Sequence, residues 1–232
     1  MWLNESYEGY YNPFFGIFCL LNTANGQFNL QIGYNAAYSN PKLNNEILAL
    51  YNKENNWMSK PLSELHFMHG LFLGARYRFE QIAIALNWRS KTIGLSSEGI
   101  SPTTNTDYKM ELFYRYHTYG LNVETAGTFL SIGASIDYSV MKVKDRITGQ
   151  KKKIEFMSED GIGSHFYLNL NLPTFGNMGI ALQPYYFVDW SGLNLTKLSE
   201  RLVNGAISTN NLGKFNHFGI SLIFNNGPQA NH

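Results

Sequence analysis

Apolar and polar residues alternate along eight segments of the chain. In the first segment, one face is formed by Phe28, Leu30, Ile32, Tyr34, Ala36 and Tyr38. The opposite face is formed by Asn29, Gln31, Gly33, Asn35, Ala37 and Ser39. A period of two predicts a β-strand with two unlike faces. The seven further segments with this pattern lie at about residues 65–79, 82–89, 108–123, 130–140, 165–172, 178–190 and 214–224.

The connections between these segments alternate between long and short. The long connections lie at residues 40–63, 92–107, 142–161 and 191–213, and the short turns lie at 80–81, 125–128 and 173–177. Strands that return in this rhythm are typical of an all-β, eight-stranded, antiparallel up-and-down transmembrane β-barrel. We therefore expect four long extracellular loops at one end of the barrel and both chain termini at the short-turn end.

The long connections differ in character. Two of them contain short amphipathic helices, predicted at residues 43–51 and 195–204. The connection at 92–107 is rich in Gly, Ser, Thr and Asn, so an exposed loop is expected there. The connection at 142–161 carries the run Lys151-Lys152-Lys153, which we interpret as a solvated hairpin tip.

The segment at 108–123 breaks the alternation once. Its first half would place five side chains outward: Tyr108, Met110, Leu112, Tyr114 and Tyr116. Its second half would place Tyr119, Leu121 and Val123 outward instead. We expect a β-bulge near His117, because one extra residue shifts the phase of a strand.

The polar face of the sheet indicates which side points outward. A soluble fatty-acid-binding barrel or lipocalin turns its apolar face inward around a ligand, and its polar face would be rich in Lys, Glu and Thr. Here the polar face is mostly Gly, Ala, Ser and Asn, which suit the narrow lumen of an eight-stranded barrel. Enclosed charges need partners, and the charged residues expected in a lumen network have both signs: Arg76, Arg78, Arg89, Arg115, Glu111, Asp137 and Asp189.

Composition supports a lipid boundary. Charged residues make up 15% of the chain, below the about 25% usual for soluble domains. Aromatic residues also make up 15% and gather near the two ends of the apolar band, as in the interfacial girdles of membrane barrels. Aromatics are favoured in any strand, which is the alternative explanation. The residues expected at the long-loop end are Tyr38, Trp88, Tyr108, Tyr138 and Trp190. Those expected at the short-turn end are Phe28, Tyr77, Phe79, Tyr119, Phe129, Phe175 and Phe224.

Residues 1–26 have features of an export signal. No stretch of the chain approaches the about 20 apolar residues of a membrane helix, but the run at 14–21 has the length of a signal-peptide apolar region. Ala24-Asn25-Gly26 follows it, so the mature protein would begin at Gln27. The residues before the run contain no Lys or Arg, so a short apolar N-terminal extension stays open. The single cysteine, Cys19, excludes an internal disulfide.

Strand number, loop rhythm and the closing segment together resemble a known family. Residues 27–224 resemble the small eight-stranded outer-membrane β-barrels of Gram-negative bacteria, of the OmpX and OmpA membrane-domain type, which are grouped with porin-like outer-membrane proteins. The resemblance implies that the barrel assembly machinery recognises the last strand, through Phe218, Ile220, Leu222 and Phe224. In the family that aromatic usually ends the chain, whereas residues 225–232 follow here and would form a periplasmic tail.

The leading functional hypothesis is non-enzymatic. A lumen filled by side chains argues against a general diffusion pore. We expect a structural or surface-exposed protein of the bacterial outer membrane, whose loops contact lipopolysaccharide, outer-membrane lipid or a protein partner. The near balance of 18 basic and 17 acidic residues gives no reason to expect nucleic acid.

A second hypothesis uses the apolar residues of the two loop helices. They could dock a protein partner or bind and transport a small hydrophobic compound, and the alternative is that the helices pack together over the barrel mouth. The residues concerned are Leu43, Ile47, Leu50, Tyr51, Leu195, Leu198 and Leu202.

A third hypothesis is lipid-modifying catalysis at His69. This polar residue lies on the outward face, where the register of the hairpin at 80–81 places it opposite Thr92 and diagonal to Ser90. A histidine beside a hydroxyl can activate it for ester cleavage. No third residue that would orient His69 is identifiable, so we expect it to lie at the headgroup level instead.

The sequence offers no cofactor motif. Nucleotide loops and catalytic triads are absent from it. Four histidines are expected inside the barrel at scattered heights, which predicts no metal site: His66, His117, His165 and His217.

Overall fold

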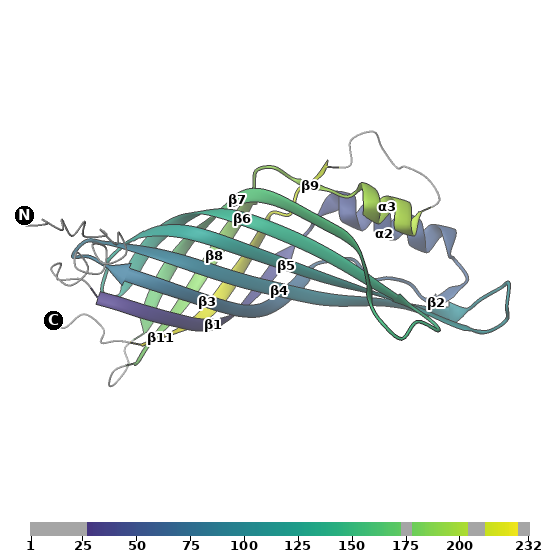
Figure 1. Ribbon diagram of the computed structural model, residues 1–232, viewed down its shortest axis with the longest axis horizontal. Helices are drawn as coiled ribbons and strands as arrows, with labels where there is room; N and C mark the ends of the chain where they lie inside the picture. The colour runs from purple at the N-terminus through teal and green to yellow at the C-terminus, as the bar shows by residue number, and fades with distance from the viewer. Residues whose placement is uncertain (1–26, 173–177, 204–211, 227–232) are drawn as a thin grey trace, which may run out of the picture.

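The computed structural model describes residues 27–172, 178–203 and 212–226, in which eight long strands form one closed ring (Figure 1). Each strand pairs antiparallel with the long strands before and after it, and the first closes the ring on the last. The all-β, eight-stranded transmembrane barrel expected from the sequence is confirmed. The strands are β1 (Gln27–Ser39), β3 (Phe67–Arg78), β4 (Ile82–Ile100), β5 (Asp107–Thr125), β6 (Leu130–Ile147), β7 (Ile154–Leu172), β8 (Met178–Asp189) and β11 (His217–Asn226).

The short turns at 80–81 and 126–129 lie at one end of the barrel, together with the start of β1 and the end of β11 (Figure 1). The tight hairpin at residues 80–81 is confirmed, because the Phe79 amide donates to the Ile82 carbonyl at 2.7 Å. The last strand continues to Asn226, two residues beyond the expected end at Phe224. The proposed signal segment 1–26, the turn at 173–177 and residues 227–232 of the proposed tail lie outside the described residues.

Four neighbouring strands are much longer than the rest. β4 to β7 have 18 or 19 residues each, whereas β1, β3, β8 and β11 have 10 to 13. A tilted strand crosses the hydrocarbon core with about 9–11 residues. The surplus carries the four long strands roughly 25 Å beyond the others, at 3.3 Å per residue, as a curved sheet (Figure 1). We call this part the extension: residues 90–100, 107–117, 140–147 and 154–160.

The extension replaces two of the expected loops. β4 continues to Ile100 and β5 begins at Asp107, so most of the connection at 92–107 is strand rather than exposed loop. The connection at 142–161 likewise consists mainly of β6 and β7, joined at 148–153. The Gly- and Ser-rich composition of residues 92–100, taken alone, predicts a loop. Pairing with β5 along its whole length makes it a strand.

The other two long connections carry the helices. α2 (Lys42–Glu54) is followed by the short strand β2 (Met58–Lys60), which pairs with the upper end of β4. α3 (Thr196–Leu202) lies between β9 (Leu193–Asn194) and β10 (Leu212–Gly213). Both helices lie over the inner face of the extension (Figure 1). In the described part of the chain, no helix is both long and apolar enough to cross a membrane.

The bulge expected near His117 is absent, because β5 keeps an unbroken register against both β4 and β6. Instead, the residues expected outward in its first half point inward and are at most 2% exposed: Met110, Leu112, Tyr114 and Tyr116. The outward row alternates with them as Lys109, Glu111, Phe113, Arg115 and His117. The apolar face of β5 therefore changes sides along a regular strand. Lipid meets its lower half from outside, and the two helices cover its upper half from inside.

Candidate functional site

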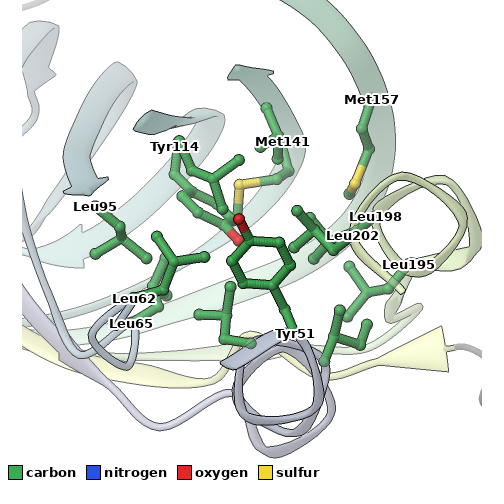
Figure 2. Packing of buried hydrophobic residues seen from close by; sticks show 14 of the residues in the cluster. Tyr51, Leu62, Leu65, Leu95, Tyr114, Met141, Met157, Leu195, Leu198 and Leu202 are labelled. Atoms are coloured by element: carbon green, nitrogen blue, oxygen red, sulfur yellow. The ribbon is translucent and has the colours of Figure 1, made fainter. Parts of the chain in front are cut away.

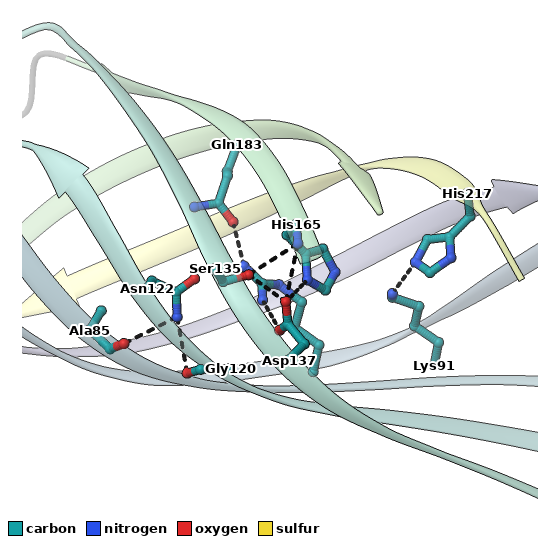
Figure 3. A network of polar contacts seen from close by, with 10 residues as sticks. Ala85, Lys91, Gly120, Asn122, Ser135, Asp137, His165, Gln183 and His217 are labelled. Carbon is teal, nitrogen blue, oxygen red and sulfur yellow. Dashed lines mark hydrogen bonds and ion pairs between the residues drawn. The ribbon is translucent and has the colours of Figure 1, made fainter. Parts of the chain in front are cut away.

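The lumen is centred on one buried carboxylate, Asp137 on β6 (Figure 3). Its Oδ2 is 3.0 Å from Nδ1 of His165 and accepts the His165 amide at 3.1 Å. Ser135 Oγ also donates to Oδ2. On the other side, Arg89 Nη1 lies 3.9 Å from Asp137 Oδ1, and Arg89 Nη2 donates to Gln183 at 3.2 Å. Four donor groups thus surround a carboxylate that has no exposure to solvent, so a buried charge is compensated.

A second group in the lumen joins a lysine to a histidine. Lys91 is completely buried, and its Nζ lies 2.5 Å from Nε2 of His217 (Figure 3). Nδ1 of His217 donates to the Phe215 carbonyl at 2.9 Å, so Nε2 of the neutral ring is the acceptor from Lys91. The lysine also lies 5.3 to 5.9 Å from three aromatic rings, those of Tyr116, Tyr185 and Phe187. Cation–π contacts of this kind stabilise a cation that is shielded from water.

A third group lies nearer the short turns. Arg76 Nη2 and Glu124 Oε1 are 2.5 Å apart, and both side chains are less than 10% exposed. Arg78 donates to the Ala126 carbonyl at 2.6 Å at the rim. Of the predicted lumen network, four residues therefore lie in the lumen or at its edge: Arg76, Arg78, Arg89 and Asp137.

The other three predicted network residues do not join these charged groups. Glu111 points outward on the extension, 2.5 Å from Arg146. Arg115 is exposed on the outer face, because it shares the outward row of β5. Asp189 accepts the amides of Gly192 at 2.8 Å and Phe215 at 3.0 Å, so it holds two loop segments together rather than pairing with an arginine.

Sequence reasoning missed two members of the lumen, Glu124 and Lys91. It placed His165 inside the barrel, as the structure has it, but without its partner Asp137. Glu124 shares the inward parity of its strand, so continuing the alternation past Val123 would have found it. Lys91 was missed because the strand was ended at residue 89, whereas β4 continues for eleven more residues.

Side chains fill the lumen at the level of these groups. Arg89, Lys91, Phe72, Tyr116 and Phe187 each have no exposure to solvent. Inward-facing glycines provide the space, because a Cβ at Gly219 would lie 2.5 Å from the Tyr185 hydroxyl, and one at Gly133 would overlap the Tyr167 ring. Among the described residues, the lumen at this level is therefore occupied by side chains rather than by open space.

An apolar core closes the mouth above the lumen (Figure 2). α2 contributes Ile47, Leu48 and Tyr51, and α3 contributes Leu198 and Leu202, all of them at most 6% exposed. They meet Met110, Leu112, Tyr114, Met141 and Met157 from the inner face of the extension. Burial raises the pKa of the Tyr51 phenol well above its ordinary value.

This core distinguishes between the two hypotheses for the loop helices, an exposed docking surface and packing over the barrel mouth. Ile47, Tyr51, Leu195, Leu198 and Leu202 are buried, while Leu43 and Leu50 pack against the same cluster. The hypothesis that these side chains form an exposed docking surface is therefore wrong. The helices pack over the barrel mouth and form a cap, defined here as α2 and α3.

The outer wall of the barrel is an apolar belt. Exposed aliphatic side chains cover it, including Leu30, Leu86, Leu121 and Ile136, each between 54% and 64% exposed. A continuous exposed apolar surface around a closed barrel is typical of a surface that faces lipid. Six of the expected girdle residues are exposed on the outer wall: Phe28, Tyr38, Phe79, Phe129, Tyr138 and Trp190. Tyr119 is exposed there too, but the register places it between Trp88 and Tyr138, so its assignment to the short-turn end is wrong.

Trp88 and Tyr77 also lie on the outward rows of their strands but are half-buried, and the ring of Trp88 stacks with that of His117 at 5.7 Å between centroids. His117 was expected inside but lies on the outward row of β5. Tyr108 shares the inward parity of β5 and packs at 5.4 Å on Trp57, beside the capping core, so its assignment to a girdle is wrong. Phe175 lies outside the described residues.

The closing strand presents its apolar row outward, as expected. Phe218, Ile220 and Leu222 are exposed and Phe224 is half-buried. Phe224 pairs with Ile32 on β1 and Ile180 on β8. Its role in recognition by the assembly machinery remains a proposal.

His69 lies opposite Thr92, as the hairpin register predicts. Its Nδ1 is hydrogen-bonded to the Tyr34 hydroxyl, and its ring contacts Phe67 at 5.9 Å. Thr92 Oγ1 donates to the His69 carbonyl at 3.4 Å rather than to its ring. The ring therefore does not activate Thr92. Among the described residues, no group of three or more His, Cys, Asp or Glu side chains could hold a metal ion.

No protein-family model and no curated protein sequence matches the chain. Similar solved structures include Ail of Yersinia pestis in complex with the heparin analogue sucrose octasulfate, with 11% identity over 86% of this chain and 98% of that one, at a TM-score of 0.49. Neisserial surface protein A is 11% identical over 88% and 99%, at 0.40. The N-terminal β-barrel domain of Pseudomonas aeruginosa OprF is 10% identical over 87% and 99%, at 0.35.

This chain has the fold of a small outer-membrane β-barrel. The closed ring of eight antiparallel strands and the apolar belt on its outer wall establish that fold. At these low identities the likeness says nothing about what the barrel binds.

Proposed function

We propose that the chain is a non-enzymatic integral protein of the bacterial outer membrane, with a structural or surface-interaction role. The observation that carries this proposal is the closed lumen beneath the cap. Arg89, Asp137 and His165 cross the lumen, and the capping core lies directly above them. Such a barrel offers its outer surface and its extension to partners, rather than a passage.

The orientation follows from the family resemblance. Both termini would lie in the periplasm, residues 1–26 would be an export signal, and residues beyond 226 would form a short tail there. The extension and the cap would then project from the cell surface, where they could contact lipopolysaccharide or a protein. The barrel assembly machinery would insert the chain by its closing strand.

Conductance tests the closed lumen. We expect the folded protein in a planar lipid bilayer to give no current steps above those of a protein-free bilayer. The double variant Tyr185→Ala/Phe187→Ala removes two rings that fill the lumen, so it should give measurable steps. The matched double variant Tyr186→Ala/Val188→Ala alters neighbouring positions on the outward row and should stay silent. Steady ion steps from the wild-type protein would overturn the proposal.

A further inference from the structure

The outer face of the extension carries a basic groove next to the lipid belt. The groove has a volume of about 450 Å³, and its charged lining residues are Arg115, Lys142, Lys144 and Lys153, with His69 at its edge. They come from β3, β5, β6 and the turn after β6. The sequence assigned no function to the lysine run that ends at Lys153.

The strand register places these cations on two adjoining rows. One row runs His69, Thr92, Arg115, Lys142 and Ser158 across five strands. The next row runs Gly94, Phe113, Lys144 and Glu155. Arg115 and Lys142 are thus directly opposed cross-strand neighbours. Like charges at such positions destabilise a sheet unless something between them compensates.

Carboxylates in the groove do not match the cations. Glu155 is 3.8 Å from Lys142 and 3.1 Å from Lys144, so one acid serves two lysines. Lys153 Nζ lies 3.3 Å from the centre of the Phe113 ring. In the part of the chain that the structure describes, no acidic side chain lies within salt-bridge distance of Arg115 or Lys153. The groove therefore has an excess of three positive charges that an anion could neutralise.

The height of the groove identifies the source of that anion. On the same outer face, Leu86, Leu121 and Ile136 form a lipid-facing row, and Trp88, Tyr119 and Tyr138 form the aromatic row above it. The basic row begins two same-face rows beyond the aromatic row. That separation is roughly 13 Å along the strands, and about 9 Å along the membrane normal for strands tilted near 45°. Aromatic rows lie at the edge of the hydrocarbon, so the basic row lies at the level of lipid headgroups.

We infer that this groove binds a phosphate group on the headgroup of an outer-leaflet glycolipid. Arginine offers a planar fork for two phosphate oxygens, and the lysines add point charges around them. The apolar belt below would meet the acyl chains of the same molecule. The inference rests on the proposed membrane placement and specifies the lipid contact of that function.

Lipid titration of the purified full chain in detergent, read by native mass spectrometry, tests the inference. Diphosphoryl lipid A, its dephosphorylated form, inorganic phosphate and soluble dextran sulfate are the probes. We expect diphosphoryl lipid A to bind about tenfold more tightly than the dephosphorylated form, since charge-assisted hydrogen bonds are lost with the phosphates. Equal binding of the two lipids would overturn the inference. Tighter binding of dextran sulfate or free phosphate than of lipid A would overturn the lipid assignment.

Three variants locate the site. Arg115→Gln/Lys142→Gln should weaken lipid A binding about tenfold, by the loss of two charge-assisted contacts. Gly94→Glu adds an acid to the groove without removing a cation, and it should weaken binding too. Its Cβ would meet only Phe113 ring carbons at 3.6 Å, an ordinary contact. Glu155→Gln removes the competing acid, so it should tighten binding.

The control is Lys109→Gln, which removes a lysine from the same outer face. Lys109 lies higher on the extension, 3.0 Å from Glu98. Loss of the Lys109 charge should leave the affinity for lipid A within about twofold of the wild-type value, because an exposed ion pair contributes little. A loss as large as that of the groove variants would indicate general charge attraction and overturn the site. Heat-dependent gel migration of every sample reports separately on the barrel, so weak binding by a protein that still shifts counts against the groove alone.

Discussion

Asp137 is the residue on which the electrostatics of the lumen depend. It faces Arg89 and His165 and has no exposure to solvent. Removing one partner of a buried charge pair leaves the other charge uncompensated, which costs more than the pair itself contributes. The lumen should therefore be more sensitive to loss of this carboxylate than to loss of any single cation around it.

Asp137→Asn should lower the free energy of unfolding by about 3 kcal/mol, as expected for a broken buried pair. Urea titration of the detergent-folded protein measures it. Asp107→Asn removes the same charge from an exposed position at the start of β5, and it should shift the midpoint little. Equal shifts in the two variants would show that the buried carboxylate is not special.

Lys91→Met should behave differently. Among the described residues, no carboxylate lies within salt-bridge distance of this lysine, which meets His217 and three aromatic rings. Methionine keeps the apolar part of the side chain and removes the cost of burying the ammonium. The free energy of unfolding should therefore stay within about 1 kcal/mol of the wild-type value. The same urea titration measures it, and a loss as large as that of Asp137→Asn would refute the expected difference between cation and carboxylate.

Among the elements, α2 and α3 determine how the upper strands present their faces. Their side chains make an apolar core with the inner face of the extension, as a soluble sheet and its helices do. Asn45 and Asn52 of α2 accept the amides of Leu65 and Leu62 at 2.9 Å and hold the returning chain against the helix. The cap is therefore held by its own core and hydrogen bonds, and not by the strands that face lipid.

Leu198→Ala should loosen the cap and leave the barrel intact. The cavity should cost about 2–4 kcal/mol, because Leu198 is completely buried. Limited trypsin digestion should then cleave within α2 and α3 more quickly, while boiling still changes the migration of the remaining barrel. Glu46→Gln, on the exposed face of α2, is the control. Unchanged digestion of Leu198→Ala would contradict a cap held by this core.

The alternation of the sequence predicted the lower barrel well and the extension poorly. Segments such as Leu130–Tyr138 meet lipid outside and small side chains inside, so each residue's polarity reports its face directly. Above His117 the same rule inverts, since Leu112 faces the cap and Arg115 faces outward. A single pattern cannot distinguish such an inversion from a bulge. The two cases differ in what each face of the strand packs against, and that depends on contacts between residues far apart in the chain.

The charge network, too, was predicted correctly in the lower barrel and wrongly in the extension. Arg76, Arg89 and Asp137 lie in the lower barrel, where parity alone places them inside. Glu111 and Arg115 lie in the extension, where parity was misread. Asp189 has inward parity, but its oxygens accept loop amides, which no strand pattern encodes.

On the scale of the whole molecule, the barrel is asymmetric. Eight strands form the membrane wall, and four of them continue as a capped sheet on one side (Figure 1). At the opposite end, the described residues contain only the turns at 80–81 and 126–129 and the ends of strands. Within the described residues, the surface that a partner could contact beyond the lipid is therefore concentrated on the extension and its cap.

Heat-dependent gel migration of the protein from the outer-membrane fraction tests the central claim most directly. A barrel closed by β1 and β11 should stay folded in cold dodecyl sulfate and migrate at a different position after boiling, with a β-rich circular dichroism spectrum before it. A protein that is recovered in the soluble fraction and migrates identically with and without boiling would contradict the membrane barrel.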